Sequence, residues 1–141
     1  MPLTVTKSEV WTCEMPDQTG SLAMKLAPLA KAKVDLDFLI ARRQADRPGT
    51  GVVFLAGIKG AAQSKAAKAA GLEKTAALAA LRVDGSNKPG IVAQIVEQLA
   101  AEHINLRGAS ATTIGKKFAV ILAFDNSADA ATAAKLIAKI R

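Results

Sequence analysis

The sequence repeats itself after 70 residues, and this repeat constrains the fold more strongly than any other feature of the chain. A shift of 70 superimposes the following pairs: Asp17 on Asn87, Gly20 on Gly90, Leu29 on Leu99 and Leu36 on Leu106. Further along, a shift of 67 matches Val53–Ala56 to Val120–Ala123. The difference of three residues falls where a loop tip is expected, because loops tolerate insertions. The chain therefore contains two copies of one unit, which we expect as domains of residues 1–74 and 75–141.

Hydrophobic periodicity predicts the order strand, helix, strand, strand, helix in each copy. In the first copy we expect strands 9–15, 34–41 and 51–58 and helices 21–33 and 61–70. In the second we expect strands 78–84, 104–114 with a kink at Gly108, and 118–124, with helices after residues 90 and 126. Pro28 predicts a bend or a break in its helix. The predicted helix caps are Asn87 for the third helix and Asn126 or Ser127 for the fourth.

Two strand-helix-strand crossovers that frame a hairpin form an antiparallel sheet with both helices on one face. The sequence therefore predicts an α+β fold of two ferredoxin-like βαββαβ units. The closing strand of each unit is the least certain element. We expect that of the first copy to be shared with, or packed against, the segment 73–84. The second copy stops at Arg141 before any closing strand, and Pro2–Lys7 is the segment that could fill the gap.

Composition narrows the class of protein. The net charge of +7 suggests nucleic-acid binding, but residues 1–70 hold ten Lys or Arg and six acids, and residues 71–141 hold nine and six, so no single patch is indicated. The single cysteine, Cys13, excludes an intramolecular disulfide and suits a reducing compartment. No apolar run reaches the roughly 20 residues of a membrane span. The first residues also lack the layout of a secretory signal. We therefore expect a cytoplasmic protein.

Both copies place a polar, glycine-bearing turn directly before a helix, at Asp17–Gly20 and at Asn87–Gly90. A helix start exposes unpaired N–H groups and a partial positive charge, which bind carboxylate or phosphate. Glycine lets a ligand approach the backbone closely. A neighbouring Asn or Asp oxygen can accept a hydrogen bond from an ammonium group. These groups match the two ends of a free amino acid.

The segment Ser86–Leu106 resembles the opening strand, turn, helix and strand of the ACT domain family of small-molecule-binding regulatory modules. The resemblance rests on the Asn-x-Pro-Gly turn, on the aliphatic pair Ile91-Val92 and on the Ile-Asn-Leu that follows the helix. It is weaker in the first copy, where Thr19 stands in place of the proline although Gly20 is kept. Together the two copies cover nearly the whole chain.

The resemblance implies that an amino acid binds between the first turn and helix of one domain and a neighbouring domain. The implied ligand-binding residues are Asn87, Pro89, Gly90, Ile91, Val92 and Asn105 in the second copy and Asp17, Gly20, Ser21 and Leu22 in the first, with Asp35 at the place of Asn105. Two carboxylates in the first copy would disfavour an anionic ligand end. We therefore expect the main site in the second copy, and in the first either a degenerate site or one with a different preference.

Plainer interpretations stay open for the same residues. Asn87 can be a helix cap alone, Gly20 and Gly90 can be turn glycines alone, and Asn105 can simply end a strand. Cys13 and His103 lie at non-equivalent places, so we expect no catalytic pair. One His and one Cys fall short of the four ligands of a structural zinc site, and we expect neither metal nor cofactor.

The alternative function is nucleic-acid binding, because RNA-recognition domains share the ferredoxin-like plan. Those domains stack bases on sheet aromatics, whereas this chain has no Tyr, one Trp and four Phe. Phosphate contact alone stays possible through Arg42, Arg43, Arg47, Lys116 and Lys117. We expect a non-catalytic regulatory module that binds an amino acid and shifts an assembly equilibrium. Open sheet edges favour a homodimer, and such a module needs a partner enzyme or regulator.

Overall fold

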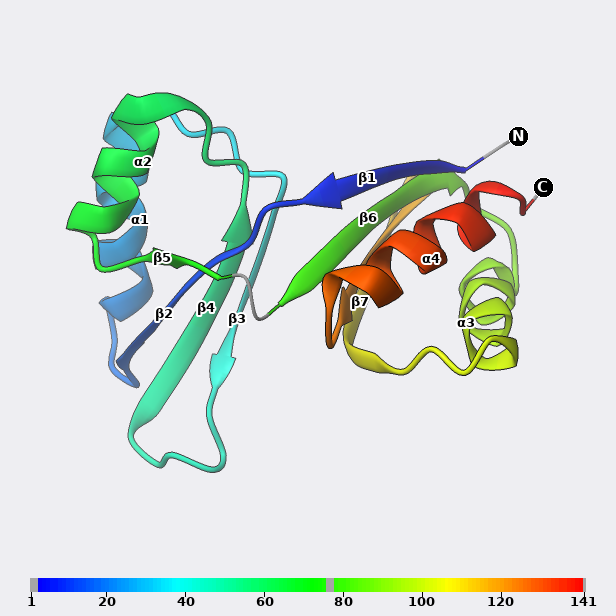
Figure 1. Cartoon of the computed structure of the whole chain (residues 1–141). Coiled ribbons are helices and arrows are strands. Elements are labelled where there is room, and N and C mark those ends of the chain that lie inside the picture. Colours follow the sequence, from blue (N-terminus) through cyan, green and yellow to red (C-terminus); the bar gives the residue numbers. More distant parts are fainter. Residues whose placement is uncertain (1–2, 76–77, 141) are drawn as a thin grey trace. The chain divides into compact units, whose positions relative to one another are not determined.

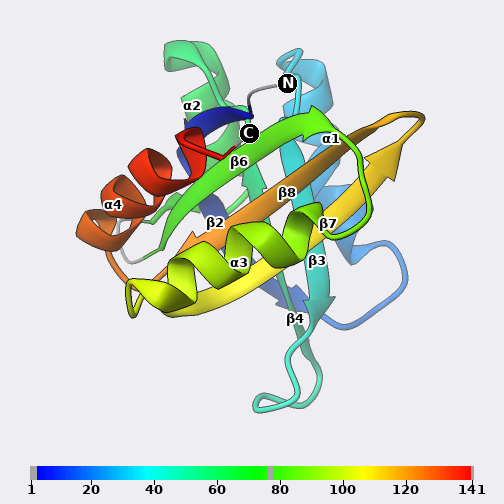
Figure 2. The same cartoon turned by 90° about the vertical axis from the view of Figure 1, so that its right-hand side faces the viewer.

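The computed structural model describes residues 3–75 and 78–140. These residues form two units: residues 9–75 (the first unit), and residues 3–8 joined with residues 78–140 (the second unit). Within them each unit has its own apolar core and one four-stranded antiparallel sheet with two helices on one face (Figure 1, Figure 2). The expected α+β architecture of two ferredoxin-like units is confirmed.

The first unit has the strand order β3-β4-β2-β5. Its elements are β2 (Trp11–Pro16), α1 (Ser21–Lys31), β3 (Phe38–Arg43), β4 (Thr50–Ala56), α2 (Gly60–Ala69) and β5 (Glu73–Lys74). The core lies between sheet and helices and is built on Trp11, Leu29, Val53 and Leu55. The two residues of β5 pair with β2 and close the sheet, as expected for the segment 73–84, of which residues 76 and 77 lie outside the described residues.

The second unit has the strand order β1-β6-β8-β7. Its elements are β1 (Thr4–Ser8), β6 (Ala79–Ser86), α3 (Ile91–Ala101), β7 (Leu106–Ile114), β8 (Lys117–Phe124) and α4 (Ser127–Ala138). Figure 2 shows α3 and α4 lying over one face of this sheet. The closing strand β1 pairs with β6, from Thr4 opposite Asp84 to Ser8 opposite Ala80. The expectation for Pro2–Lys7 is thereby confirmed for Thr4–Lys7, while Pro2 lies outside the described residues.

The position of β1 changes the division of the chain. We expected domains of residues 1–74 and 75–141, whereas the structure places residues 3–8 in the second unit. The physical reason is the edge of β6, whose backbone groups β1 pairs by antiparallel hydrogen bonding. The chain therefore passes from one unit to the other twice.

The ends of α1 and α3 repeat the same geometry. Lys33 and His103 adopt left-handed φ angles of 61° and 59°. After them, the N–H of Val34 donates to Leu29 at 3.0 Å, and the N–H of Ile104 donates to Leu99 at 3.0 Å. Both ends are therefore Schellman motifs, in which the left-handed residue lets the next residue satisfy a late helix carbonyl. Because Val34 ends the helix in this way, β3 begins at Phe38 and not at residue 34 as expected.

The structure bears on three local predictions, which concern Pro28, Asn126 and Gly108. A break at Pro28 is wrong, because α1 continues to Lys31. Asn126 is confirmed as a helix cap, because its Oδ1 accepts from the N–H of Asp129 at 2.8 Å. The kink at Gly108 is confirmed by a register shift between Leu106 and Gly108 against β8.

Candidate ligand-binding site

The turn before α1 owes its shape to Gly20. The N–H of Ser21 donates to the carbonyl of Gln18 at 3.2 Å, and Gly20 between them has φ 89° and ψ −10°. These are the values of the third residue of a type II turn, where a positive φ favours glycine. A Cβ on Gly20 would meet nothing within 4 Å, so the backbone angle and not the space selects glycine here.

The turn before α3 has the same form. The N–H of Ile91 donates to Lys88 at 3.2 Å, and Gly90 has φ 86° and ψ 0°. Pro89 occupies the second position of the turn, which it favours because its ring fixes φ. The Asn-x-Pro-Gly segment is thus a turn motif with a physical cause.

Asn87 does not cap α3. The N-cap residue is Gly90, without a side-chain capping bond, so the expected cap is wrong. Instead the N–H of Asn87 donates to the carbonyl of Lys116 at 2.8 Å, just as the N–H of Asp17 donates to Gly49 at 3.0 Å. Each turn is thereby tied to the adjacent hairpin loop of its own unit, and the Asn87 side chain is exposed.

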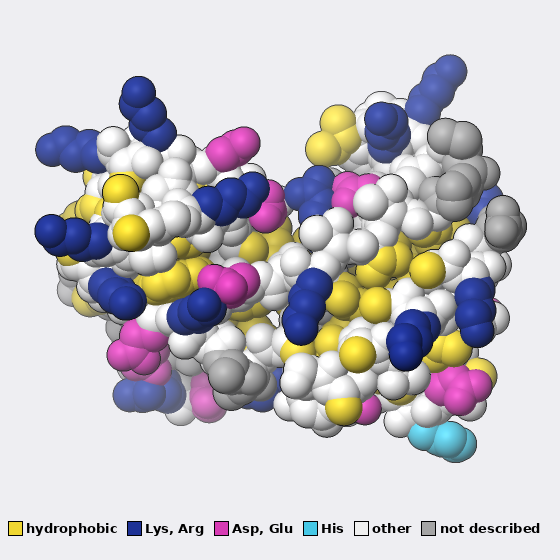
Figure 3. Space-filling model, turned by 45° about the horizontal axis from the view of Figure 1, so that its top comes forward, with side chains coloured by type: hydrophobic (Ala, Val, Ile, Leu, Met, Phe, Trp, Pro, Cys, Tyr) yellow, Lys and Arg dark blue, Asp and Glu magenta, His cyan; other side chains and the backbone are white. Residues whose placement is uncertain are grey.

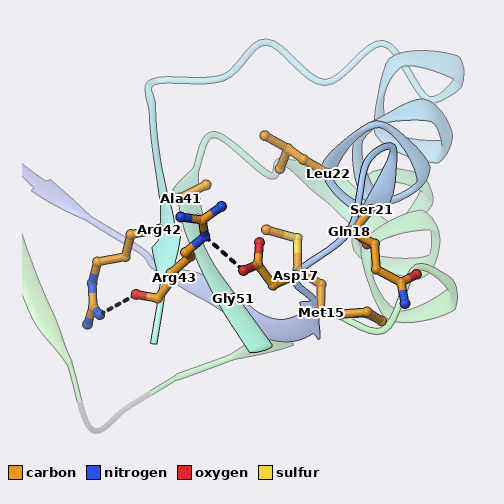
Figure 4. Close-up of a pocket in the computed structure, with 10 residues that line it drawn as sticks. Met15, Asp17, Gln18, Ser21, Leu22, Ala41, Arg42, Arg43 and Gly51 are labelled. Atoms are coloured by element: carbon orange, nitrogen blue, oxygen red, sulfur yellow. Dashed lines mark hydrogen bonds and ion pairs between the residues drawn. The ribbon is translucent and has the colours of Figure 1, made fainter. Parts of the chain in front are cut away.

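The first unit contains a cleft of about 220 Å³ beside its turn (Figure 4). It lies where the end of β2, the start of α1, the end of β3 and the start of β4 meet. We call it the first-unit cleft; its lining residues are Met15, Pro16, Asp17, Gln18, Ser21, Leu22, Ala41, Arg42, Arg43 and Gly51. Since one water molecule needs only about 10–15 Å³ of such space, the cleft has room for a small ligand.

Opposite charges stand at the first-unit cleft. Nε of Arg43 lies 2.8 Å from Oδ2 of Asp17, and both side chains are partly exposed (83% and 37%). Figure 4 shows Arg43 reaching toward Asp17, whereas Arg42 points away and its Nη1 donates to the Arg43 carbonyl at 3.3 Å. Of the two carboxylates expected at the first-copy site, Asp17 lines the cleft and pairs with Arg43, and Asp35 is not among the lining residues. Asp35 precedes β3, whose other end lines the cleft.

Backbone donors at the start of α1 add positive potential to this place. Among the described residues, no backbone oxygen accepts from the N–H of Leu22 or Ala23. Such free N–H groups at a helix start favour an anion. The opposite charges and these donors together can hold both ends of a zwitterion.

Apolar side chains from β2, β3 and α1 also line the first-unit cleft. Met15, Leu22 and Ala41 pack against the core of the first unit, and Gly51 pairs with Met15 across β4 and β2. A Cβ on Gly51 would lie 3.2 Å from the carbonyl oxygen of Arg42 and 3.5 Å from Cε of Met15. The closest approach at this glycine is therefore to the backbone of β3, and the Met15 side chain is in contact distance beyond it.

The expected residues of the second copy are brought together only in part. Asn87, Pro89, Gly90, Ile91 and Val92 gather at the start of α3. Asn105 follows the other end of this 11-residue helix, about 16 Å away at 1.5 Å per residue. Within its own unit, Asn105 is therefore too far from the turn to contact the same small ligand.

Cys13 and His103 lie apart from these turns. Burial raises the pKa of the Cys13 thiol, and the positive charge of Lys25 lowers it in part. His103 is exposed at the end of α3. Within residues 3–75 and 78–140, no group of three or more His, Cys, Asp or Glu side chains could hold a metal ion. None of the helices in this same part of the chain is long and apolar enough to cross a bilayer.

Reasoning from the sequence missed Arg43, Met15 and Gly51 as cleft residues. The available signal was the comparison of the two copies, in which Ala41-Arg42-Arg43 stands against Ala-Thr-Thr at 111–113. That difference was assigned to a variable loop. In the structure β3 continues to Arg43 and delivers its side chain to the turn.

Comparison with known proteins places the fold. No family model matches the sequence, and no curated protein matches it. Among solved structures, a protein from Bacteroides thetaiotaomicron shares 20% identity at a TM-score of 0.70, covering 94% of this chain and 88% of that one. The ligand-free regulatory subunit of aspartate kinase from Thermus thermophilus shares 16% sequence identity at a TM-score of 0.66. The match covers 99% of this chain and 98% of that one. Aspartokinase III from E. coli, in complex with aspartate and ADP, shares 13% at 0.61, covering 96% of this chain but 32% of that one.

Proposed function

We propose that this chain is a non-catalytic regulatory module of the ACT type, which binds a free amino acid in the first-unit cleft. The observation that carries the proposal is the pairing of Asp17 and Arg43 at the mouth of a small cleft with an apolar floor. An amino acid presents one charge of each sign next to a side chain, so it can engage both residues at once.

The binding mode follows from the charges. The ligand carboxylate lies between Arg43 and the free N–H groups of Leu22 and Ala23, and the ligand ammonium lies at Asp17. The ion pair of Asp17 and Arg43 is solvent-exposed, and exposed pairs contribute little to stability, about 0–1 kcal/mol. Separating the two side chains to admit a ligand therefore costs little.

The regulatory part of the proposal is supported by the structures that share this fold. One is the regulatory subunit of aspartate kinase over nearly its whole length, and another is an aspartokinase crystallised with aspartate. A ligand regulates only if it binds one assembly state better than another. We propose a homodimer that acts on a partner enzyme or regulator and whose assembly responds to the amino acid.

The test is a calorimetric and thermal-shift screen of the free L-amino acids against the full chain. A ligand at 100 times its Kd should stabilise the protein by about 2.7 kcal/mol. Asp17→Asn and Arg43→Gln should abolish the response. Arg47→Gln is the matched control, because Arg47 pairs with Glu14 outside the cleft. Absence of any response in the wild type would refute the proposal.

The charge distribution weakens the nucleic-acid alternative. Arg43 and Arg47 are engaged with Asp17 and Glu14, so two of the arginines assigned to phosphate are already paired. On the face drawn in Figure 3, Lys and Arg side chains stand dispersed over both units among acidic and uncharged groups. Strong, salt-dependent retention on heparin without an amino-acid response would favour the alternative.

A further inference from the structure

The two sheets differ at one pair of facing positions. In the first unit Met15 on β2 faces Gly51 on β4. At the equivalent place in the second unit, Gly85 on β6 faces Phe118 on β8. The large and the small residue have exchanged strands. Since the repeat aligns the rest of both sheets, this exchange is a difference in side chains and not in backbone plan.

The large residues of the two pairs differ in burial: Phe118 is buried, whereas Met15 is half-buried. A Cβ on Gly85 would lie 2.6 Å from Cδ2 of Leu3 and 3.0 Å from Cε1 of Phe118, a residue that is 3% exposed and belongs to the second core. Met15 instead is half-buried and packs at the margin of the first core. A buried aromatic ring fills its place completely, whereas an unbranched thioether adapts to a neighbour.

We infer that Met15 and Gly51 form the pocket for the ligand's side chain, that this side chain is apolar, and that Phe118 closes the equivalent position, so each chain binds one ligand. The inference rests on the proposed function and specifies the ligand class and the number of sites. Phe118 occupies in the second unit the position that Gly51 occupies in the first. It lies on β8, with Gly85 opposite it on β6 and Thr113 opposite it on β7. Thr113 also replaces the cation that Arg43 supplies at the first-unit cleft.

The ligand class follows from the floor of the cleft. Among its lining residues, Asp17 and Arg43 pair with each other, while Met15 and Ala41 on the sheet and Leu22 on α1 are apolar. A charged ligand side chain placed against these three apolar residues would lose water without gaining a partner from them, which is costly. The class is therefore the α-amino acids with an aliphatic or thioether side chain.

The deciding experiment transplants the second unit's pair into the first. The double variant M15G/G51F gives the first unit the glycine and phenylalanine that face each other in the second unit. Isothermal titration with alanine, valine, leucine, methionine, aspartate and lysine should show one site per wild-type chain and a preference for an apolar ligand. The double variant should lose more than about 100-fold in affinity, since one methylene in excess in an apolar pocket costs roughly 10- to 200-fold. The matched control F118L should bind as the wild type does.

The variant Gly51→Ala gives a second measurement if the double variant does not fold. Its Cβ would lie 3.2 Å from the Arg42 carbonyl oxygen and 3.5 Å from the Met15 methyl group. The added methyl group takes up space beside Met15, so it should shift the preference toward smaller side chains by about 10-fold or more. Two sites per chain, a preference for aspartate or lysine, or unchanged binding by both Gly51 variants would overturn the inference and leave the proposed function standing. No binding of any amino acid to the wild type would overturn both.

Discussion

Replacing Lys33 or His103 with glycine should stabilise the unit that contains the residue. Both residues hold φ near 60° at the C-terminal cap of a helix. A left-handed conformation costs a residue with a Cβ about 1–2 kcal/mol, and glycine adds roughly 0.5–1 kcal/mol of unfolded-state entropy. The net gain is about 1 kcal/mol, which raises the Tm of a domain of this size by about 4–8 °C. The two gains should be equal, because the caps share the same hydrogen bonds.

The fluorescence of the single tryptophan distinguishes a change in the stability of the first unit from a change in the second. Trp11 is buried in the core of the first unit, so its fluorescence follows the unfolding of that unit, while far-ultraviolet circular dichroism follows both. In urea, Lys33→Gly should move the fluorescence midpoint upward and His103→Gly should not. Ala27→Gly, an exposed position inside α1, is the control and should cost about 1 kcal/mol. A loss of stability in Lys33→Gly would refute the assignment of strain to the cap.

Three further outcomes follow from the structure. Deleting residues 1–8 uncovers the edge of β6 and should unfold the second unit at lower temperature, while the fluorescence transition of Trp11 stays unchanged. Gly20→Ala and Gly90→Ala should each cost about 1 kcal/mol in urea unfolding: the added methyl groups meet no atom within 4 Å, so only backbone strain of about 1–2 kcal/mol acts, and the lower unfolded-state entropy of alanine offsets part of it. Burial raises the pKa of Cys13, so its alkylation by iodoacetamide, followed by mass spectrometry, should accelerate only at a higher pH than that of free cysteine. For the same reason stability should fall as the pH rises through the ordinary thiol range, and Cys13→Ser should lack this loss.

The fold was predictable because each turn and each hydrophobic pattern occurs in both copies of the repeat, so each element is predicted from two segments of the sequence. Gly20 and Gly90 mark the same turn, and the hydrophobic periods of the two copies support each other. The closing strand Thr4–Ser8 could be proposed only by elimination, since a short polar strand carries little periodicity. The expected cap at Asn87 failed because a type II turn places the helix start three residues later, at Gly90.

The candidate site was harder to predict because it depends on which residues face one another across strands. Gly51 comes to lie beside Met15 and Arg43 through the register of β4 with β2 and β3. Sequence periodicity identifies strands but does not set their register. The segment with Arg42 and Arg43 also resembled a loop by its charge, whereas the structure extends β3 through both residues.

The strand β1, which closes the second sheet, is synthesised before the strand β6 with which it pairs. During synthesis β1 leaves the ribosome before its partner Ala80–Asp84 exists. At roughly 5–20 residues per second, the 76 residues between Ser8 and Asp84 take about 4–15 s to add. Through that interval β1 lacks the strand with which it pairs, whereas the described strands of the first sheet all lie within residues 9–75 and need no later segment. A tag fused before β1 is therefore attached to the second unit and not to the first, although residues 9–75 follow it directly in the sequence.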